Sequence, residues 1–345
     1  MSKSCGTGDA GKEFWGNNME QIQTYRILWQ ERKDGSARLL RIYGTSPQVF
    51  IPAKITGHPC VEIAPYCFAP KMQLPQGGYQ EDIVSAEKGF EPYLQELCKN
   101  AVEEVILPDT VEEIGNCAFY DCRQLKQLHM GPAVHVVGSD AFMNTLSLQK
   151  ILLRCPADEK SGIQKILSQI SSSIEVCFQS GNRTEAVLLY PEYYESYDEI
   201  APAHLFGRSI TGEGFRARQC FQEGRVDFSG YDAVFLQACV EESENTLFKM
   251  ALNRLQYPYG LADGQKERYQ DYLKAHIARC ASALVRQRDL KALRFLCKEK
   301  LLYGAALAAC IRDAAEMEWT EGAADLLQLA ATGKEEKKSR YDFDL

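Results

Sequence analysis

An apolar pattern that recurs at a fixed interval constrains this chain more than any other feature of its sequence. When the sequence is shifted by one interval, Val105 falls on Leu128, and a second shift brings it to Ile151. The same shift also superposes Leu107 on Met130, Val111 on Val134, Ile114-Gly115 on Val137-Gly138, Ala118-Phe119 on Ala141-Phe142 and Leu125 on Leu148. A fixed period of about 23 residues indicates a solenoid, in which each turn buries its apolar side against the next turn.

Each turn of this predicted solenoid begins with a short strand whose side chains alternate between two faces. The inward positions are Val105, Leu107, Leu128, Met130, Ile151 and Leu153. The outward positions are Glu104, Ile106, Gln127, His129, Lys150 and Leu152. A divergent earlier copy places Phe50 in a cross-strand row with Ile106, His129 and Leu152. We predict that these seven outward residues bind a protein partner, unless the helical region or residues 70–100 cover the row within the chain.

Two segments carry a resemblance to a known repeat family. They read IPAKITGHPCVEIAPYCF and VILPDTVEEIGNCAFYDCRQLKQLHM. Both resemble the BspA-like bacterial leucine-rich repeat, whose unit has a strand ending in Pro, then V-x-x-I-G-x-x-A-F, then C-x-x-L. The resemblance covers roughly residues 45–155 and implies a solenoid that presents an extended surface. The chain departs from the family pattern at Gly131, where Pro is expected, and at Thr145, where Cys is expected.

We expect an α+β protein, in which a short leucine-rich-repeat β-solenoid precedes a helical domain of helix-pair repeats. The expected parts are a flexible leader, the repeat domain, a junction, the helical domain and a charged tail, at 1–20, 21–190, 191–231, 232–332 and 333–345. The repeat domain should begin with a β-hairpin around Asp34-Gly35. It should also contain an insertion at 70–100, with a helix-like segment at Tyr93–Leu97.

The pattern fades after residue 155, where we expect a helix at 160–170 and strands at 174–178 and 186–190. These elements would extend or cap the open end of the solenoid. Helical periodicity then predicts helices at 232–240, 244–256, 265–287, 289–299, 303–317 and 320–331. The leucines Leu290, Leu293 and Leu296 recur about 33 residues later as Ala323, Leu326 and Leu329, a spacing faintly similar to an ankyrin-type helix pair.

Composition bounds the classes of partner and the compartment. The net charge of −8 argues against a broad nucleic-acid surface, which would need clustered positive charge. The polar start lacks the apolar core of an export signal, and no run of about 20 apolar residues could span a membrane. The 13 cysteines form no CxxC pair and are expected to be reduced. We therefore predict a cytosolic protein, which argues against the surface role of exported family members, and we leave its oligomeric state open.

An enzyme with a site in residues 186–222 is the alternative to an interaction module. Its ionisable groups are Glu192, Glu195, Asp198, Glu199 and His204, with Arg208, Arg216 and Arg218 nearby. The other interpretation of this segment is a tyrosine-rich junction whose carboxylates face water or pair with those arginines. The GxG at Gly212–Gly214 favours a tight turn, since a phosphate loop needs more glycines and a Lys-Ser/Thr.

No zinc-binding spacing is present among Cys117, Cys122, His129 and His135. We therefore predict no catalytic, cofactor-binding or metal-binding residues. The predicted function is a protein-protein interaction module or scaffold, which binds a partner through the solenoid face and the helical domain.

Overall fold

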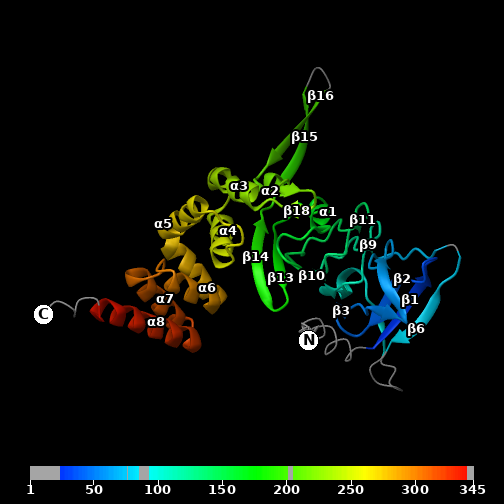
Figure 1. Cartoon of the computed structure of the whole chain (residues 1–345), viewed down its shortest axis with the longest axis horizontal. Helices are drawn as coiled ribbons and strands as arrows, with labels where there is room; N and C mark the ends of the chain where they lie inside the picture. The colour runs from blue at the N-terminus through cyan, green and yellow to red at the C-terminus, as the bar shows by residue number, and fades with distance from the viewer. Residues whose placement is uncertain (1–23, 76, 85–92, 201–204, 340–345) are drawn as a thin grey trace, which may run out of the picture. The chain divides into compact units, whose positions relative to one another are not determined.

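The computed structural model describes residues 24–75, 77–84, 93–200 and 205–339 of the chain (Figure 1). The chain forms two compact units, which divide between Val234 and Phe235 inside helix α3 (Phe228–Glu241). The first unit holds the β-solenoid and the second is helical, so the predicted α+β class is confirmed. The leader expected at 1–20 lies outside the described residues.

The strands that begin the repeats form one six-stranded sheet in the first unit. In spatial order they are β3 (Gln48–Phe50), β8 (Glu104–Ile106), β10 (Gln127–Met130), β12 (Lys150–Leu153), β13 (Ile174–Ser180) and β14 (Arg183–Tyr190). The first five run parallel and β14 is antiparallel. Leu128 pairs with Val105 on one side and Ile151 on the other, so the interval found in the sequence is the strand register. All six residues predicted to face inward have no solvent exposure.

A second sheet collects the N-terminal hairpin and a second short strand from each of the turns that begin with β3, β8 and β10. Its strands are β1 (Tyr25–Glu31), β2 (Ala37–Gly44), β4 (Lys54–Ile55), β5 (His58–Ile63), β6 (Gln80–Val84), β7 (Gln95–Glu96), β9 (Glu113–Ile114) and β11 (Val136–Val137). The predicted hairpin is confirmed: Gly35 has a φ of +79°, and Ser36 N–H donates to Asp34 Oδ1 at 3.0 Å. Ile63 and Ile114 pair across parallel strands and are fully buried, which places the core beneath this sheet as well.

The described part of the 70–100 insertion contributes strands to the second sheet. Strand β6 pairs with β1 and strand β7 pairs with β2. A short 3₁₀ turn follows at Lys99–Ala101. The helix-like interpretation of Tyr93–Leu97 is wrong, because β7 occupies Gln95–Glu96. An apolar pattern this short cannot distinguish a helix from a strand, and here Leu97 is buried whereas Tyr93 is 91% exposed.

Three phenylalanine rings stack through the core of the solenoid, one from each of three turns. The Phe68 and Phe119 ring centroids lie 4.9 Å apart, and those of Phe119 and Phe142 lie 5.1 Å apart. The glycine of the Ile-Gly pair permits this close spacing, because a Cβ on Gly115 would lie 2.5 Å from the backbone nitrogen of Pro65. The predicted stacking of Phe119 and Phe142 is therefore confirmed.

A short helix, α1 (Ile163–Leu167), follows the last turn at the point where we expected a capping helix. The backbone N–H of Phe119 donates to Ala141 O in the next turn of the solenoid. The equivalent N–H of Phe142 instead donates to Gln169 Oε1 at 3.3 Å, while Gln169 Nε2 donates to Gly138 O at 2.8 Å. The side chain of Gln169 thus takes the place of the backbone of a further turn.

The segment from 191 to 227, in the expected junction, has regular structure of its own. It contains β15 (Tyr194–Ile200), β16 (Leu205–Thr211), α2 (Gly214–Ala217), β17 (Phe221–Gln222) and β18 (Arg225–Val226). Strands β15 and β16 form an antiparallel two-stranded ribbon. Gly212 has a φ of +94°, as the tight turn predicted at the GxG requires.

Helices make up the second unit, as the periodicity predicts. After α3 they are α4 (Glu244–Gln256), α5 (Asp263–Gln287), α6 (Leu290–Lys298), α7 (Gly304–Glu316) and α8 (Thr320–Ser339). Helix α7 packs against α5 and α8. Helix α8 continues beyond the expected end at residue 331 and into the expected tail, in a stretch rich in the good helix formers Lys and Glu.

The helix pairs repeat at a shorter interval than the leucine pattern predicts. Two backbone features that precede α6 recur before α8. The first is a positive φ, at Arg288 and at Glu318. The second is a hydrogen bond back to the preceding helix, from Asp289 N–H to Leu284 O and from Trp319 N–H to Ala314 O. Leu296 is then equivalent to Leu326, and both are fully buried. The predicted equivalence of Leu296 with Leu329 is therefore wrong. The two alignments differ by nearly one helical turn, which leaves the apolar residues on the same helix face, so the apolar pattern alone could not distinguish them.

Replacing Phe142 with alanine should lower the free energy of unfolding by about 3–5 kcal/mol, the usual cost for a buried phenylalanine. Phe142 is 1% exposed and stacks on Phe119. The adjacent Met143 is 47% exposed, so Met143→Ala should change the free energy by less than about 0.5 kcal/mol. Urea unfolding followed by circular dichroism measures both values. Equal losses in the two variants would contradict the stacked register.

Candidate functional site

The outward face of the six-stranded sheet carries the row predicted from the sequence. Strand register pairs Phe50 with Ile106, Ile106 with His129, and His129 with Leu152. All four residues are partly buried. These four residues, called the outer row below, form a continuous strip across β3, β8, β10 and β12.

A second strip of polar side chains runs beside the outer row, two residues earlier on each strand. This polar row consists of Gln48, Glu104, Gln127, Lys150 and Glu175. The sequence predicts its three central members and misses Gln48 and Glu175. Glu175 pairs with Lys150 but follows it at a longer interval than the repeat period. The fixed period therefore could not predict that Glu175 belongs to this row.

Glu104 connects the two rows. Its Oε2 accepts a hydrogen bond from Gln48 Nε2 at 2.6 Å, and its Oε1 lies 2.7 Å from His129 Nε2. These contacts join three neighbouring strands and hold the three polar side chains in defined positions. A face whose side chains are already positioned loses less conformational freedom when it binds.

Burial lowers the pKa of His129 below its usual value of 6.5. The Glu104 carboxylate opposes this shift, whereas the cations of Arg154 and Lys150 add to it because they repel an imidazolium. Arg154 is held beside the row by a hydrogen bond to Leu107 O at 2.5 Å. The charge of His129 therefore depends on pH and on how much water reaches the row.

The outer row extends beyond the residues that the sequence identifies. Cys177 on β13 pairs with Leu152 and, on its other side, with Val187 on β14. Both added residues are buried, at 7% and 5% exposure. Sequence reasoning missed them because the repeat pattern is no longer visible after residue 155. The partly exposed section of the row therefore lies on β3, β8, β10 and β12.

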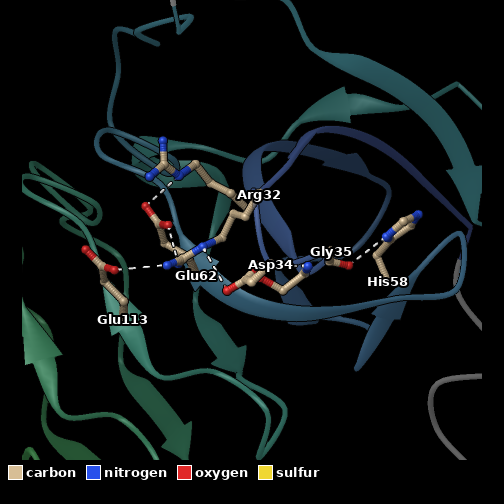
Figure 2. Close-up of polar contacts among 8 residues, drawn as sticks. Arg32, Asp34, Gly35, His58, Glu62 and Glu113 are labelled. Carbon is tan, nitrogen blue, oxygen red and sulfur yellow. Dashed lines mark hydrogen bonds and ion pairs between the residues drawn. The ribbon is translucent and has the colours of Figure 1, made fainter.

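A buried ion-pair cluster lies on the second sheet (Figure 2). Glu62, 1% exposed, accepts a hydrogen bond from Arg32 Nη1 at 2.6 Å, and its other oxygen lies 2.6 Å from Arg38 Nε. Arg32 also lies 3.6 Å from Glu113 of the next turn. Burial raises the pKa of Glu62, and the hydrogen bond from Arg38 opposes that shift. The sequence did not predict this cluster.

Glu62 is poorly placed for acid-base chemistry, because a guanidinium contacts each of its carboxylate oxygens. Its contacts join the β1–β2 hairpin to strand β5 instead. Removing both arginines would leave the Glu62 carboxylate buried without a counter-charge, a loss that typically costs about 3–5 kcal/mol. His58 adds a further contact to the same hairpin, since its Nδ1 lies 2.8 Å from Gly35 O (Figure 2). We therefore assign this cluster to the attachment of the hairpin.

The candidate groups of the 186–222 segment have separate surroundings. Glu195 and Arg208 form an exposed ion pair at 2.7 Å. Arg216 contacts Glu213 at 2.9 Å, with its own side chain 62% exposed. Arg218 is 3% exposed and donates to backbone carbonyls of Ile170, Ser172, Pro191 and Gly214. His204 lies outside the described residues, as do the side chains of Asp198 and Glu199.

Within the part of the chain that the structure describes, no group of three or more His, Cys, Asp or Glu residues could hold a metal ion. Cys122 is buried, and its thiol donates to Phe68 O at 3.3 Å. In the same described ranges, no helix combines the length and the apolar character needed to cross a membrane.

The folded state should lose stability as the pH falls from about 7 to 5, in part through His129. Its pKa is lowered by folding, so the unfolded chain takes up the proton first. The stability that is present above the unfolded pKa is lost as the pH falls through the folded pKa. His129→Gln should reduce this loss, whereas His135→Gln, at an exposed position, should not. Urea unfolding at three pH values tests this, and an unchanged pH dependence in His129→Gln would contradict it.

The comparisons with known proteins locate the repeats independently of the structure. Residues 94–185 match the family model described as the BspA type leucine rich repeat region (6 copies). No curated protein and no solved structure matches the chain. This match begins after the start of the resemblance described above, which covers roughly residues 45–155, and it ends later in the chain. It includes strands β8, β10, β12 and β13. Residues 94–185 are therefore similar to the BspA type leucine-rich-repeat region.

Proposed function

We propose that this chain is a protein-interaction module that binds a partner protein through the outer row and the polar row. The observation that carries the proposal is the register, which aligns Phe50, Ile106, His129 and Leu152 on the outward face. Apolar side chains in this position gain roughly 25 cal/mol for each Å² of apolar area that a partner covers. The adjoining polar row supplies hydrogen-bonding groups at the border of that strip, the usual anatomy of an interface.

The repeat architecture supports the same conclusion. Leucine-rich-repeat regions are generally protein-interaction modules, and stacked turns build broad surfaces more readily than deep pockets. The net charge of −8 supports a protein partner over a nucleic acid. The compartment we propose is the cytosol, and the free state of the 12 cysteines in the described residues supports it.

The helical unit supplies a second surface for the same partner in this proposal. Several large apolar side chains are exposed on it, namely Leu236, Val240, Tyr303 and Leu327. Exposed apolar side chains that occur singly are ordinary on any protein, so the outer row remains the main contact surface of the proposal.

The contacts of the 186–222 segment favour a structural role over the enzymatic alternative. Arg218 is committed to backbone carbonyls, and Glu195 is paired with Arg208. Acid-base catalysis needs groups that converge on one reacting atom. The described groups of this segment instead support the end of the solenoid and the ribbon that follows it.

A cytosolic protein should keep all of its 13 cysteines reduced. The 12 cysteines in the described residues are free. Burial raises the pKa of Cys60 and of Cys122 to about 12, so these thiols should react slowly in the folded protein. Thiol titration of denatured protein, prepared without reductant and protected from air, should give 13. A stable count well below 13 would contradict the proposed compartment.

The double variant Ile106→Glu/Leu152→Glu tests the outer row. If a separate protein covers the row, the variant should keep its melting temperature and fail to recover that partner in a pull-down. If another part of the chain covers the row, the variant should lose stability. The two measurements together separate these outcomes.

The matched control is Val136→Glu/Met143→Glu. Both residues are apolar and exposed, at 39% and 47%, and lie outside the outer row. This control should leave melting temperature and partner recovery unchanged. If the outer-row variant behaves like the control in both measurements, the row is an ordinary solvated face and the proposal fails.

A further inference from the structure

The β15–β16 ribbon projects away from the strands of the solenoid (Figure 1). Its seven residue pairs run from Tyr194–Thr211 to Ile200–Leu205. Among the described strands, neither ribbon strand pairs with a third strand. Each therefore presents an outer edge of backbone N–H and C=O groups, which is a template for the addition of another strand.

The base of the ribbon is fixed to the end of the solenoid. Arg218 donates to Pro191 O at 2.6 Å and to Ser172 O at 2.7 Å, and so connects the start of the ribbon to the chain that precedes β13. The guanidinium of Arg208 lies 5.3 Å from the ring centroid of Phe215, which also contacts Tyr193. The ribbon is thus oriented at its base, and an edge that is already extended binds a strand at a lower entropic cost.

The described side chains of β15, at residues 194–197, are exposed. Tyr194 and Tyr197 are each 64% exposed. Successive residues of a strand point to opposite faces, so these two rings lie on the two faces of β15. An isolated two-stranded ribbon is only marginally stable in water, and a third strand would add backbone hydrogen bonds and cover aromatic surface.

The charge of β15 selects the kind of segment that fits there. Residues 191–200 contain four carboxylates and neither Lys nor Arg. The described cross-strand partner is Arg208, which pairs with Glu195 at 2.7 Å and lowers its pKa. A basic segment would meet complementary charge along this edge. A second copy of β15 would instead place carboxylates against carboxylates.

We propose that the β15 edge of this ribbon binds an extended, lysine- or arginine-rich segment of a partner protein by strand addition. The backbone of the segment would pair with the outer edge of β15, and its positive charge would complement the net negative charge of residues 191–200. This surface is separate from the outer row, so the proposal does not depend on the function proposed above.

The test uses the full chain and a fluorescent seven-residue peptide that alternates lysine with valine. We expect fluorescence anisotropy to show binding that weakens as salt is added, because exposed charges are screened. The same peptide with glutamate in place of lysine should not bind. A lysine peptide methylated on every backbone nitrogen should also fail to bind, since it retains its charge but cannot donate to a strand edge.

The ribbon variant Glu192→Gln/Asp198→Asn/Glu199→Gln removes three carboxylates and keeps the Glu195–Arg208 pair. It should bind the lysine peptide about tenfold more weakly, the effect of three modest exposed charge contacts. The control Glu112→Gln/Asp158→Asn/Glu159→Gln removes three exposed carboxylates elsewhere and should bind as the unmodified chain does. Melting temperatures establish that both variants are folded.

Three results would overturn the proposal. The first is equal binding of the methylated and unmethylated lysine peptides, which would indicate charge attraction without strand addition. The second is equal loss of binding in the ribbon variant and in its control. The third is self-association of the chain, measured by analytical ultracentrifugation, that the ribbon variant strengthens because it removes the repulsion between carboxylates, which would make a second copy the occupant. The Ile106→Glu/Leu152→Glu variant should bind the lysine peptide normally, so failure at the outer row is distinguishable from failure at the ribbon.

Discussion

The stacking of Phe119 on Phe142 in successive turns positions the repeats, and the outward face of the sheet depends on that position. Because a phenylalanine ring occupies the same place in three successive turns, the strands keep one register, and their outward side chains meet in rows. Glu104 reaches both Gln48 and His129 across two strand boundaries because this register is maintained. A core contact thus determines the geometry of a surface that it does not touch.

The two ends of the solenoid are completed by polar side chains. At the N-terminal side, the hairpin is attached through Glu62 and its two arginines, a solution that places charge in a nearly inaccessible site. At the C-terminal side, Arg218 satisfies several backbone carbonyls at once. Arg218 thus satisfies backbone groups where the repeat pattern ends, whereas the Glu62 cluster attaches the hairpin that begins the sheet.

The fixed period of the apolar pattern was sufficient to predict which strand residues are buried, because burial alternates along a strand and recurs from turn to turn. It identified most of the two outward rows for the same reason. It could not identify the Arg32–Glu62 pair, whose residues come from elements that only the folded chain brings together. It also missed Gln48 and Glu175, because the turns that separate them from the neighbouring strands differ in length from the repeat period. In the helical unit, an ambiguity of nearly one helical turn made the expected spacing of the helix pairs too long.

Gln169 has a consequence for how such a chain can change in length. Its amide offers one acceptor and one donor to the last turn, where another turn would offer backbone groups. Whole units gained or lost before this residue would leave the closing contact available to whichever turn came last. After it, the six-stranded sheet still continues through β13 and β14, but the edge that Gln169 covers has its groups already paired. Whole units can therefore be gained or lost on one side of a single glutamine, whereas on its other side only one of the two sheets continues.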